Sequence, residues 1–179
     1  MWEINFPQAL FLIIPMLRGY VDVENHSMFD PFDILGLEKT YTLDLQVLEK
    51  AYFEAQKLTH PDRFALADEP KKREASRKAS LVNQAYTLLK NPLTRAAFLL
   101  EDRGVSLLAY DLKFLHKVIE WHERHKEGEN ITLELVHEEE KLYGELERGL
   151  EKYDHEKARK ALYRLNYVQK VRTNALTAC

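Results

Sequence analysis

Hydrophobic residues recur every three or four positions along most of the chain, which is the spacing that places them on one face of an α-helix. This spacing predicts helices over residues 43–58, 70–90, 92–100, 111–126, 132–153 and 155–176. No run of β-branched residues alternates cleanly with polar ones, so no strand is predicted. The pattern therefore predicts an all-α protein.

Most of the predicted helices have one apolar face that we expect to be buried. The face of the helix over 43–58 comprises Leu45, Leu48, Tyr52, Ala55 and Leu58, and that of 70–90 comprises Ala75, Ala79, Val82, Tyr86 and Leu89. The face of the last helix comprises Ala158, Ala161, Leu162, Leu165 and Val168. Tyr163 and Tyr167 lie roughly 140–180° from that face at 100° per residue, so we expect them to point outward.

The helix over 111–126 has more apolar surface than a single core requires. Phe114, Val118 and Trp121 cover one arc, and Leu112, Leu115 and Ile119 cover the next. Together they span roughly 180°, against a stripe of roughly 100° for an ordinary amphipathic helix. Either a partner protein covers the surplus, or it packs between two helical units of this chain.

Proline and glycine positions indicate how the helices are grouped. Pro61 ends the helix over 43–58, and Gly104 closes the one over 92–100. We expect two domains, at residues 28–104 and 105–179, after an extension at 1–27. Gly144 and Gly149 each cost about 1 kcal/mol relative to alanine, which weakens the prediction that the helix over 132–153 is continuous.

The amino-acid composition excludes several classes of function. The chain of 179 residues has 26 Lys and Arg against 29 Asp and Glu, a net charge of −3. No overall basic surface is therefore available for nucleic acid. The single cysteine, Cys179, excludes a disulfide scaffold and a cysteine-ligated metal site, and it favours a reducing compartment.

The N-terminal apolar run fits no targeting signal. Phe6–Leu17 is interrupted by two prolines and is shorter than the roughly 20 residues that cross a bilayer, so no membrane association is expected. Glu3 precedes the run, which is unlike a secretory signal, and residues 1–27 hold one arginine and three acids, which is unlike a mitochondrial presequence. We expect an extension, with Met28 as an alternative start, in preference to a targeting segment. The bacterial cytoplasm is the expected compartment, in preference to the mitochondrial matrix.

The most specific local feature is His60-Pro61-Asp62, between two predicted helices. Proline fixes φ and stops the first helix, so the flanking histidine and aspartate are displayed on a rigid turn. An exposed carboxylate there can accept charge-assisted hydrogen bonds from a partner arginine. Basic residues lie on both sides of the turn, at Lys50, Lys57, Arg63, Lys71, Lys72 and Arg73. The sequence therefore predicts a local basic docking surface.

Several further segments give this turn a family context. The opening MFDPFDILGL at 28–37, the His60-Pro61-Asp62 turn and the segment NQAY at 83–86 resemble a J-domain. The segment NPLTRAAFLL at 91–100 resembles, more narrowly, the HscB branch of J-type co-chaperones of iron–sulfur cluster assembly. The last 70 or so residues match that branch in length and helical layout, with little strict motif.

This resemblance implies an L-shaped all-α molecule. Its J-domain is an antiparallel helical hairpin with a short first helix, and its C-terminal domain is a three-helix bundle. The implied function is that of a co-chaperone, not an enzyme, with no cofactor. It stimulates the ATPase of an HscA/DnaK-type chaperone and delivers the iron–sulfur scaffold protein IscU to it for cluster assembly and transfer. A J-domain co-chaperone for a different client protein is the alternative.

The resemblance also implies two sets of binding residues. Those for the chaperone are His60, Pro61, Asp62, Lys50, Lys57 and Arg63. Those for the scaffold are Leu115, His116, Ile119, Glu120, Glu123 and Tyr167. This chain has His116 where the family usually has Met, and Tyr167 where it usually has Phe.

Other charged clusters have ordinary explanations. His122 and His125 invite a metal-dependent hydrolase as a rival function, but they lack a third ligand and the His spacing of zincins, so solvated histidines are favoured and no metal is expected. The run Glu138–Glu140 is expected to form a solvated face. The basic start of the last helix, Lys157, Arg159, Lys160 and Arg164, is expected to pair with the acidic middle helix.

Overall fold

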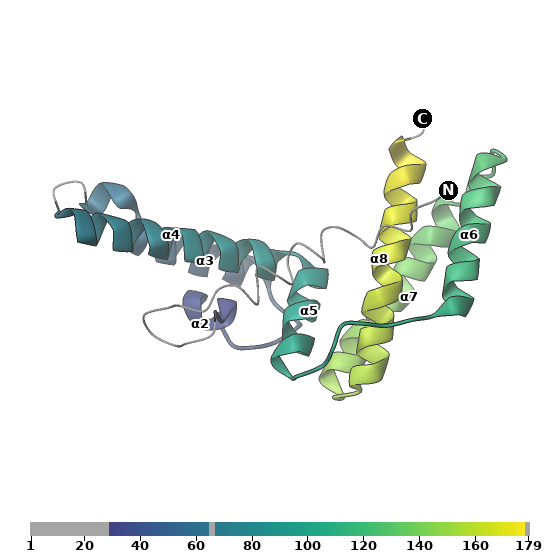
Figure 1. Cartoon of the computed structure of the whole chain (residues 1–179), viewed down its shortest axis with the longest axis horizontal. Helices are drawn as coiled ribbons and strands as arrows, with labels where there is room; N and C mark the ends of the chain where they lie inside the picture. Colours follow the sequence, from purple (N-terminus) through teal and green to yellow (C-terminus); the bar gives the residue numbers. More distant parts are fainter. Residues whose placement is uncertain (1–28, 65–66, 178–179) are drawn as a thin grey trace. The chain divides into compact units, whose positions relative to one another are not determined.

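The computed structural model describes residues 29–64 and 67–177 (Figure 1). Every regular element in these ranges is a helix, which confirms the predicted all-α class. The chain divides into two compact units, whose described residues are 29–64 with 67–95 and 96–177. The predicted extension at residues 1–27 and the alternative start at Met28 lie outside the described residues.

The first unit contains the predicted hairpin and the short helix that precedes it. Its elements are α2 (Pro31–Leu35), α3 (Leu45–Thr59), the 3-10 helix η1 (Pro61–Phe64) and α4 (Glu69–Lys90). Aspartates cap the N-termini: Asp30 accepts from the Phe32 amide at 2.9 Å, and Asp44 accepts from the Gln46 amide at 2.8 Å. Helix α4 packs against both α2 and α3 (Figure 1).

Helix α5 (Pro92–Asp102) follows α4 after a sharp corner made by three polar side chains. Asn91 Oδ1 accepts from the Leu93 amide at 2.8 Å, and the Thr94 hydroxyl donates to the Leu88 carbonyl at 2.6 Å. The buried Arg95 guanidinium donates to the Leu89 carbonyl. The polar residues of the NPLTRA segment therefore end one helix and start the next by satisfying backbone groups that the corner exposes.

The second unit begins within α5 and contains the predicted three-helix bundle. The helices of the bundle are α6 (Leu112–Lys126), α7 (Thr132–Glu151) and α8 (His155–Thr177). Helix α8 packs against both α7 and α6, and the core includes the fully buried side chains of Trp121, Leu142 and Leu165. Helix α7 is continuous through both glycines. A Cβ at Gly149 would lie 2.7 Å from the Ala158 nitrogen, so glycine there allows α7 and α8 to approach closely.

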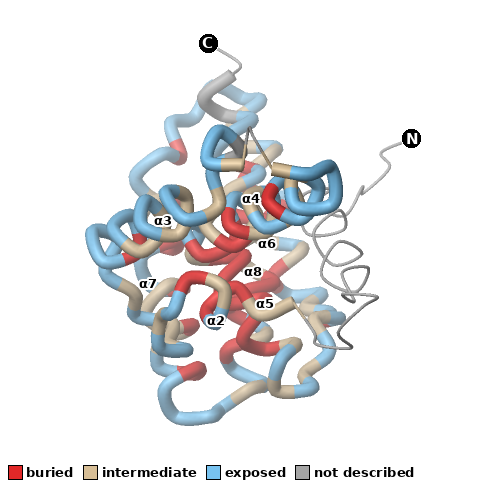
Figure 2. The backbone as a smooth tube through the Cα atoms, turned by 90° about the vertical axis from the view of Figure 1, so that its left-hand side faces the viewer, coloured by how far each residue is buried: buried red, intermediate tan, exposed pale blue. Residues whose placement is uncertain are grey.

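The buried face of α3 is narrower than predicted. Leu48 is fully buried, but Leu45 is exposed and Leu58 is 66% exposed (Figure 2, pale blue along α3). At 100° per residue, Leu45 lies about 60° and Leu58 about 80° from Leu48 around the helix axis, on opposite sides. Within the described part of the chain, the main helix contacts of α3 are with α4 and α2, so a narrow apolar stripe is enough to cover them.

The buried face of α8 is wider than predicted. The expected core residues are buried, but so are Tyr163 and Tyr167, the latter only 8% exposed. The prediction that this pair points outward is therefore wrong. Its physical reason is that α8 has neighbours on two sides, and Tyr163 lies against the start of α6 at Asp111.

Two predictions about charged clusters also need correction. In the run Glu138–Glu140 the last residue is exposed as predicted, but Glu138 and Glu139 are buried, and ion pairs with Lys117 (2.8 Å) and Arg172 compensate their charges. The basic start of α8 makes no ion pair with α7 among the described residues. Its pairs are instead Arg159–Glu156, Lys160–Glu156 and Arg164–Asp111.

Candidate functional site

The first candidate surface is the His60 turn, which comprises His60, Pro61, Asp62 and Arg63. Helix α3 ends at Thr59, and Pro61 opens the 3-10 helix η1 directly after His60. The side chains of His60 and Asp62 are exposed, and Asp62 Oδ2 lies 3.6 Å from His60 Nδ1. The Asp62 amide donates to His60 Nδ1 at 3.3 Å, so Nε2 carries the proton of the neutral imidazole. The turn thus presents one donor and one carboxylate to a partner.

Arg63 is exposed, but its guanidinium is already engaged in a hydrogen bond with the protein backbone. Its Nη1 donates to the Lys57 carbonyl at 2.9 Å, and its amide donates to the His60 carbonyl at 3.1 Å. The guanidinium therefore satisfies a carbonyl that the end of α3 leaves without a helical partner. Arg63 ties the turn to the helix that precedes it.

The predicted basic residues of α3 share one exposed side. Lys50 and Lys57 are seven positions apart, so they lie within about 20° of each other around the axis. Both are exposed, and Lys57 pairs with Glu54 at 2.9 Å. The structure therefore brings Lys50 and Lys57 onto the free face of the helix that ends at His60.

A polar cluster that the sequence did not single out joins α3 to α4 about one to two turns before His60. The Tyr52 and Tyr86 rings stack with centroids 4.2 Å apart, and the Tyr52 hydroxyl donates to Asn83 Oδ1 at 2.9 Å. Gln56 Nε2 donates to the same oxygen at 3.1 Å. Asn83 and Tyr86 belong to the NQAY segment, so that motif is the sequence feature from which the cluster could have been predicted. The contacts of the cluster hold α3 and α4 in register.

The second candidate surface is the α6 outer face, which comprises Leu112, Leu115, His116, Ile119, Glu120 and Glu123. All six residues lie within about 140° around the helix axis. Leu115 is half-buried, whereas His116, Ile119, Glu120 and Glu123 are exposed. The sixth predicted scaffold residue, Tyr167, is buried on α8 and does not join this face. Leu112, absent from the predicted set, is 72% exposed and extends the face by one turn.

The N-terminus of α6 is fixed by contacts with α8. The capping residue Asp111 accepts from the Phe114 amide at 3.1 Å and from Arg164 Nε at 2.8 Å. The guanidinium of Arg164 also lies 5.4 Å from the centre of the Phe114 ring. Burial raises the pKa of the Asp111 carboxyl, but the hydrogen bonds from Arg164 and Phe114 outweigh it and hold that pKa below its usual value.

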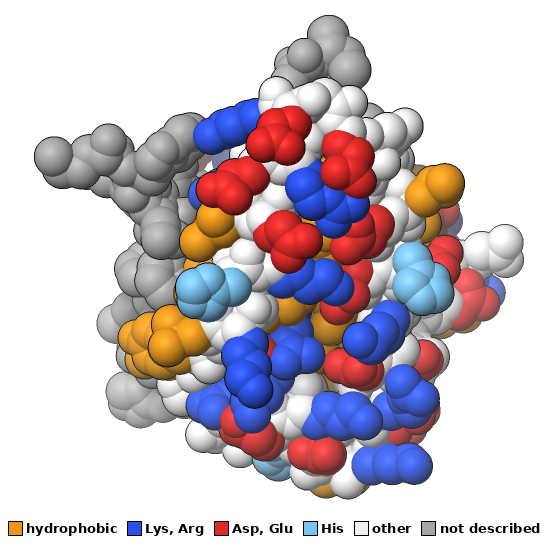
Figure 3. All heavy atoms as spheres, turned by 90° about the vertical axis from the view of Figure 1, so that its right-hand side faces the viewer, with side chains coloured by type: hydrophobic (Ala, Val, Ile, Leu, Met, Phe, Trp, Pro, Cys, Tyr) orange, Lys and Arg blue, Asp and Glu red, His pale blue; other side chains and the backbone are white. Residues whose placement is uncertain are grey.

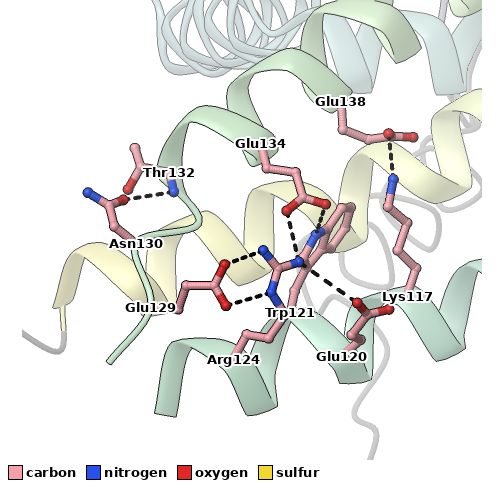
Figure 4. Close-up of polar contacts among 9 residues, drawn as sticks. All are labelled: Lys117, Glu120, Trp121, Arg124, Glu129, Asn130, Thr132, Glu134 and Glu138. Carbon is pink, nitrogen blue, oxygen red and sulfur yellow. Dashed lines mark hydrogen bonds and ion pairs between the residues drawn. The ribbon is translucent and has the colours of Figure 1, made fainter. Parts of the chain in front are cut away.

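The rest of α6 is held by a polar network with α7 and the preceding loop (Figure 4). The Trp121 indole donates to Glu134 at 2.8 Å, and Arg124 contacts Glu134 at 2.9 Å and also Glu129. The Trp121 hydrogen bond, followed by that of Arg124, lowers the pKa of Glu134, although partial burial raises it. Glu120 is 3.8 Å from Arg124, at the solvent end of this network.

Charges of both signs alternate on the α6 side of the molecule, and hydrophobic side chains gather at one edge (Figure 3). Among the described residues, no group of three or more His, Cys, Asp or Glu side chains could hold a metal ion. His122 is half-buried, and burial together with neighbouring Lys126 lowers its pKa. The described geometry therefore gives the histidine pair no third ligand.

Two protein-family models match the two units. The DnaJ domain matches residues 30–98, and the HSCB C-terminal oligomerisation domain matches residues 110–175. Solved structures share the fold: chaperone HscB from Vibrio cholerae has a TM-score of 0.76 with 24% identity, covering 83% of this chain and 96% of that one. Human co-chaperone protein HscB has a TM-score of 0.77 with 24% identity, and the match covers 83% of this chain and 81% of that one. These matches define a J-domain co-chaperone with a second helical domain.

Sequence relatives agree with these matches. A co-chaperone protein HscB homolog of Neisseria meningitidis serogroup C is 29% identical over 161 residues, covering 82% of this chain and 97% of that protein. The homolog of Aeromonas salmonicida is 40% identical over 98 residues, which cover 52% of this chain and 57% of that protein. The chain belongs to the HscB family of J-type co-chaperones. These relatives are named as co-chaperones rather than enzymes. None of the helices in the described ranges has the length and apolarity needed to span a bilayer.

Proposed function

We propose that this protein stimulates the ATPase of an HscA/DnaK-type chaperone and delivers the iron–sulfur scaffold protein IscU to it for cluster assembly and transfer. The observation that carries the proposal is the pairing of an exposed His60 turn with a separate, partly apolar α6 outer face in an HscB-family chain. We place this activity in the bacterial cytoplasm, because the sequence relatives are bacterial proteins.

The His60 turn supports the chaperone half of the proposal. Asp62 is exposed and can accept charge-assisted hydrogen bonds from an arginine, while His60 Nε2 donates beside it. Lys50 and Lys57, on the free side of α3, supply positive charge that favours a partner surface rich in carboxylates. Arg63 acts by holding the turn.

The α6 outer face supports the client half, where the client is the protein delivered to the chaperone. Leu115 and Ile119 expose apolar area on a helix fixed at its N-terminus and along its length. Glu120 and Glu123 add negative charge on the same side. A partner with an apolar patch and basic neighbours fits such a face. Tyr167 is buried on α8, where its ring centre lies 5.0 Å from that of Tyr163, so we assign it a supporting role rather than direct contact with the client.

The first experiment isolates the chaperone half. Purified wild-type protein is expected to accelerate single-turnover ATP hydrolysis by the partner chaperone, and His60→Gln is expected to abolish the acceleration with an unchanged circular dichroism spectrum. His137→Gln, which alters an exposed histidine on α7, is the matched control and should behave as wild type. Full acceleration by His60→Gln would contradict the proposal.

The second experiment isolates the client half. Leu115→Ala combined with Ile119→Ala is expected to weaken binding of purified apo-IscU about tenfold in titration calorimetry, because two apolar contacts are lost. Acceleration of the chaperone ATPase without IscU should persist. A wild-type protein that accelerates the ATPase but does not bind IscU would instead be a J-domain co-chaperone for a different client.

A further inference from the structure

The apolar surface of the second unit continues beyond the residues implied by the family resemblance. Leu108, Tyr110 and Leu112 are all strongly exposed, and Tyr110 is 76% exposed. Four of the six exposed large hydrophobic residues described in this unit lie between positions 108 and 119. We call Leu108, Tyr110, Leu112, Leu115 and Ile119 the apolar strip.

The strip lies on a backbone that is fixed at several points. Leu112, Leu115 and Ile119 fall within about 60° around the α6 axis. Upstream, the Leu108 carbonyl accepts from Arg159 Nη1 at 2.9 Å, and Asp111 is bound by Arg164. Two anchors to α8 therefore bracket Tyr110. A surface that is ordered before binding loses little conformational freedom when a partner docks.

Charge distinguishes the two ends of this surface. Glu120, Glu123 and Glu127, which we call the acidic edge, fall within about 60° on the side of α6 that adjoins the strip. Glu123 makes no ion pair with the described part of the chain, and Glu120 reaches Arg124 only at 3.8 Å. The surface is therefore apolar at its N-terminal end and acidic at its C-terminal end. Its complement is a protein surface with apolar side chains at one end and basic ones at the other.

We propose that Leu108, Tyr110 and Leu112 extend the client-binding surface through the first turn of α6 into the segment that precedes it, and determine part of its affinity. The occupant is the client of the proposed function, an IscU-type scaffold whose apolar side chains cover the strip and whose basic side chains meet the acidic edge. This inference rests on the proposed function and deepens it. Tyr110 and Leu112 are the expected anchors, because they have the largest exposed fractions among the residues of the strip.

The test uses the full chain, with purified apo-IscU of the source organism as the probe in titration calorimetry. Leu112→Asp and Tyr110→Ser are each expected to raise Kd about tenfold. Leu133→Asp is the matched control: Leu133 is 84% exposed at the start of α7 and away from the strip, so its Kd should stay within twofold of wild type. All variants should keep the wild-type circular dichroism spectrum and the client-free ATPase acceleration.

Each other outcome overturns the inference in a recognisable way. If Leu115→Asp weakens binding while Leu112→Asp and Tyr110→Ser bind as wild type, the surface ends at Leu115 and the proposed function stands. If the wild-type protein does not bind IscU, both fail together. If sedimentation shows that Leu112→Asp dissociates a dimer without changing the affinity for IscU, the occupant of the strip is a second copy of this chain.

Discussion

The His60 turn and the α6 outer face are built in opposite ways. The turn is held by contacts that span few residues, such as the hydrogen bond from Arg63 to the carbonyl of Lys57, six positions earlier. The α6 face is held by partners far away in sequence, such as Arg164, which binds Asp111 across 53 positions. A local device can be recognised as a short motif. A face held by tertiary contacts depends on the packing of the whole unit.

This difference predicts that the two surfaces fail separately. A change in the packing of α7 and α8 removes the support of α6 but leaves the short contacts around His60 in place. A change in the turn removes its own geometry and leaves the bundle intact. The predictions below test that separation, from the largest expected effect to the smallest.

The close approach of α7 and α8 at Gly149 gives the largest expected effect. Gly149→Ala places a Cβ 2.7 Å from the Ala158 nitrogen, so the backbones of α7 and α8 must move apart. Overpacking of this kind costs about 1–3 kcal/mol of unfolding free energy. Urea denaturation followed by tryptophan fluorescence, to which the buried Trp121 contributes, should show the loss, and IscU affinity should fall with it. Acceleration of the chaperone ATPase, measured without urea and without IscU, should persist.

A second glycine on the same helix provides the control. A Cβ at Gly144 would have only the end of the Arg148 side chain near it, at 3.8 Å. Gly144→Ala should therefore stabilise the unit by up to about 1 kcal/mol through helix propensity. If both substitutions changed the free energy of unfolding in the same direction, the close approach at Gly149 would not limit the packing of α7 against α8.

The predictability of each feature follows the same division between local and distant contacts. The helix limits at Leu112, Lys126 and Thr132, set by caps and periodicity, were predicted to within about a residue, and the His60 turn was recognised from its motif. Burial was predicted less well. The periodicity of one helix defines an apolar face but does not reveal how many neighbours that helix has.

Particular residues show where the sequence pattern was insufficient. Tyr167 is buried because α8 has a second neighbour, α6, and Glu139 is buried because Arg172 of α8 reaches it. Conversely, Leu58 is exposed because α3 needs only a narrow stripe. These outcomes depend on which helices meet, and the pattern within a single helix does not contain that information.

A smaller effect tests how Arg63 acts in the turn. If its guanidinium positions the turn by binding the Lys57 carbonyl, Arg63→Lys should behave like Arg63→Ala, because an ammonium keeps the charge but not the planar donor geometry. Both should lower the maximal ATPase acceleration about threefold, a loss of one exposed hydrogen bond. The readout is maximal acceleration at saturating protein.

Lys50→Ala is the matched control for Arg63, since Lys50 is exposed on the free side of α3 and makes no hydrogen bond or ion pair in the described part of the chain. It should change the concentration needed for half-maximal acceleration and reduce its salt dependence, with the maximum unchanged. Arg63→Lys with wild-type maximal acceleration would show that charge alone matters at position 63. The local contact would then not define the turn.

The smallest effect is a pH dependence confined to the second unit. Hydrogen bonds from Trp121 and Arg124 lower the pKa of Glu134 in the folded state. The folded state therefore binds protons at Glu134 less readily than the unfolded state, and the resulting stability is present above the ordinary carboxyl pKa and is lost as pH falls through the folded pKa. Glu134 is more than a third exposed, so solvent screening limits this contribution to the free energy of unfolding to about 0.5 kcal/mol.

The measurement is the free energy of unfolding as a function of pH. Between about pH 5 and 3, Glu134→Gln should lose less unfolding free energy than wild type. Glu140→Gln, an exposed change on the same helix, should follow the wild-type curve. Identical curves for all three proteins would mean that the network around Trp121 does not stabilise α6 electrostatically, and that α6 is held by its apolar packing and its contact with Arg164.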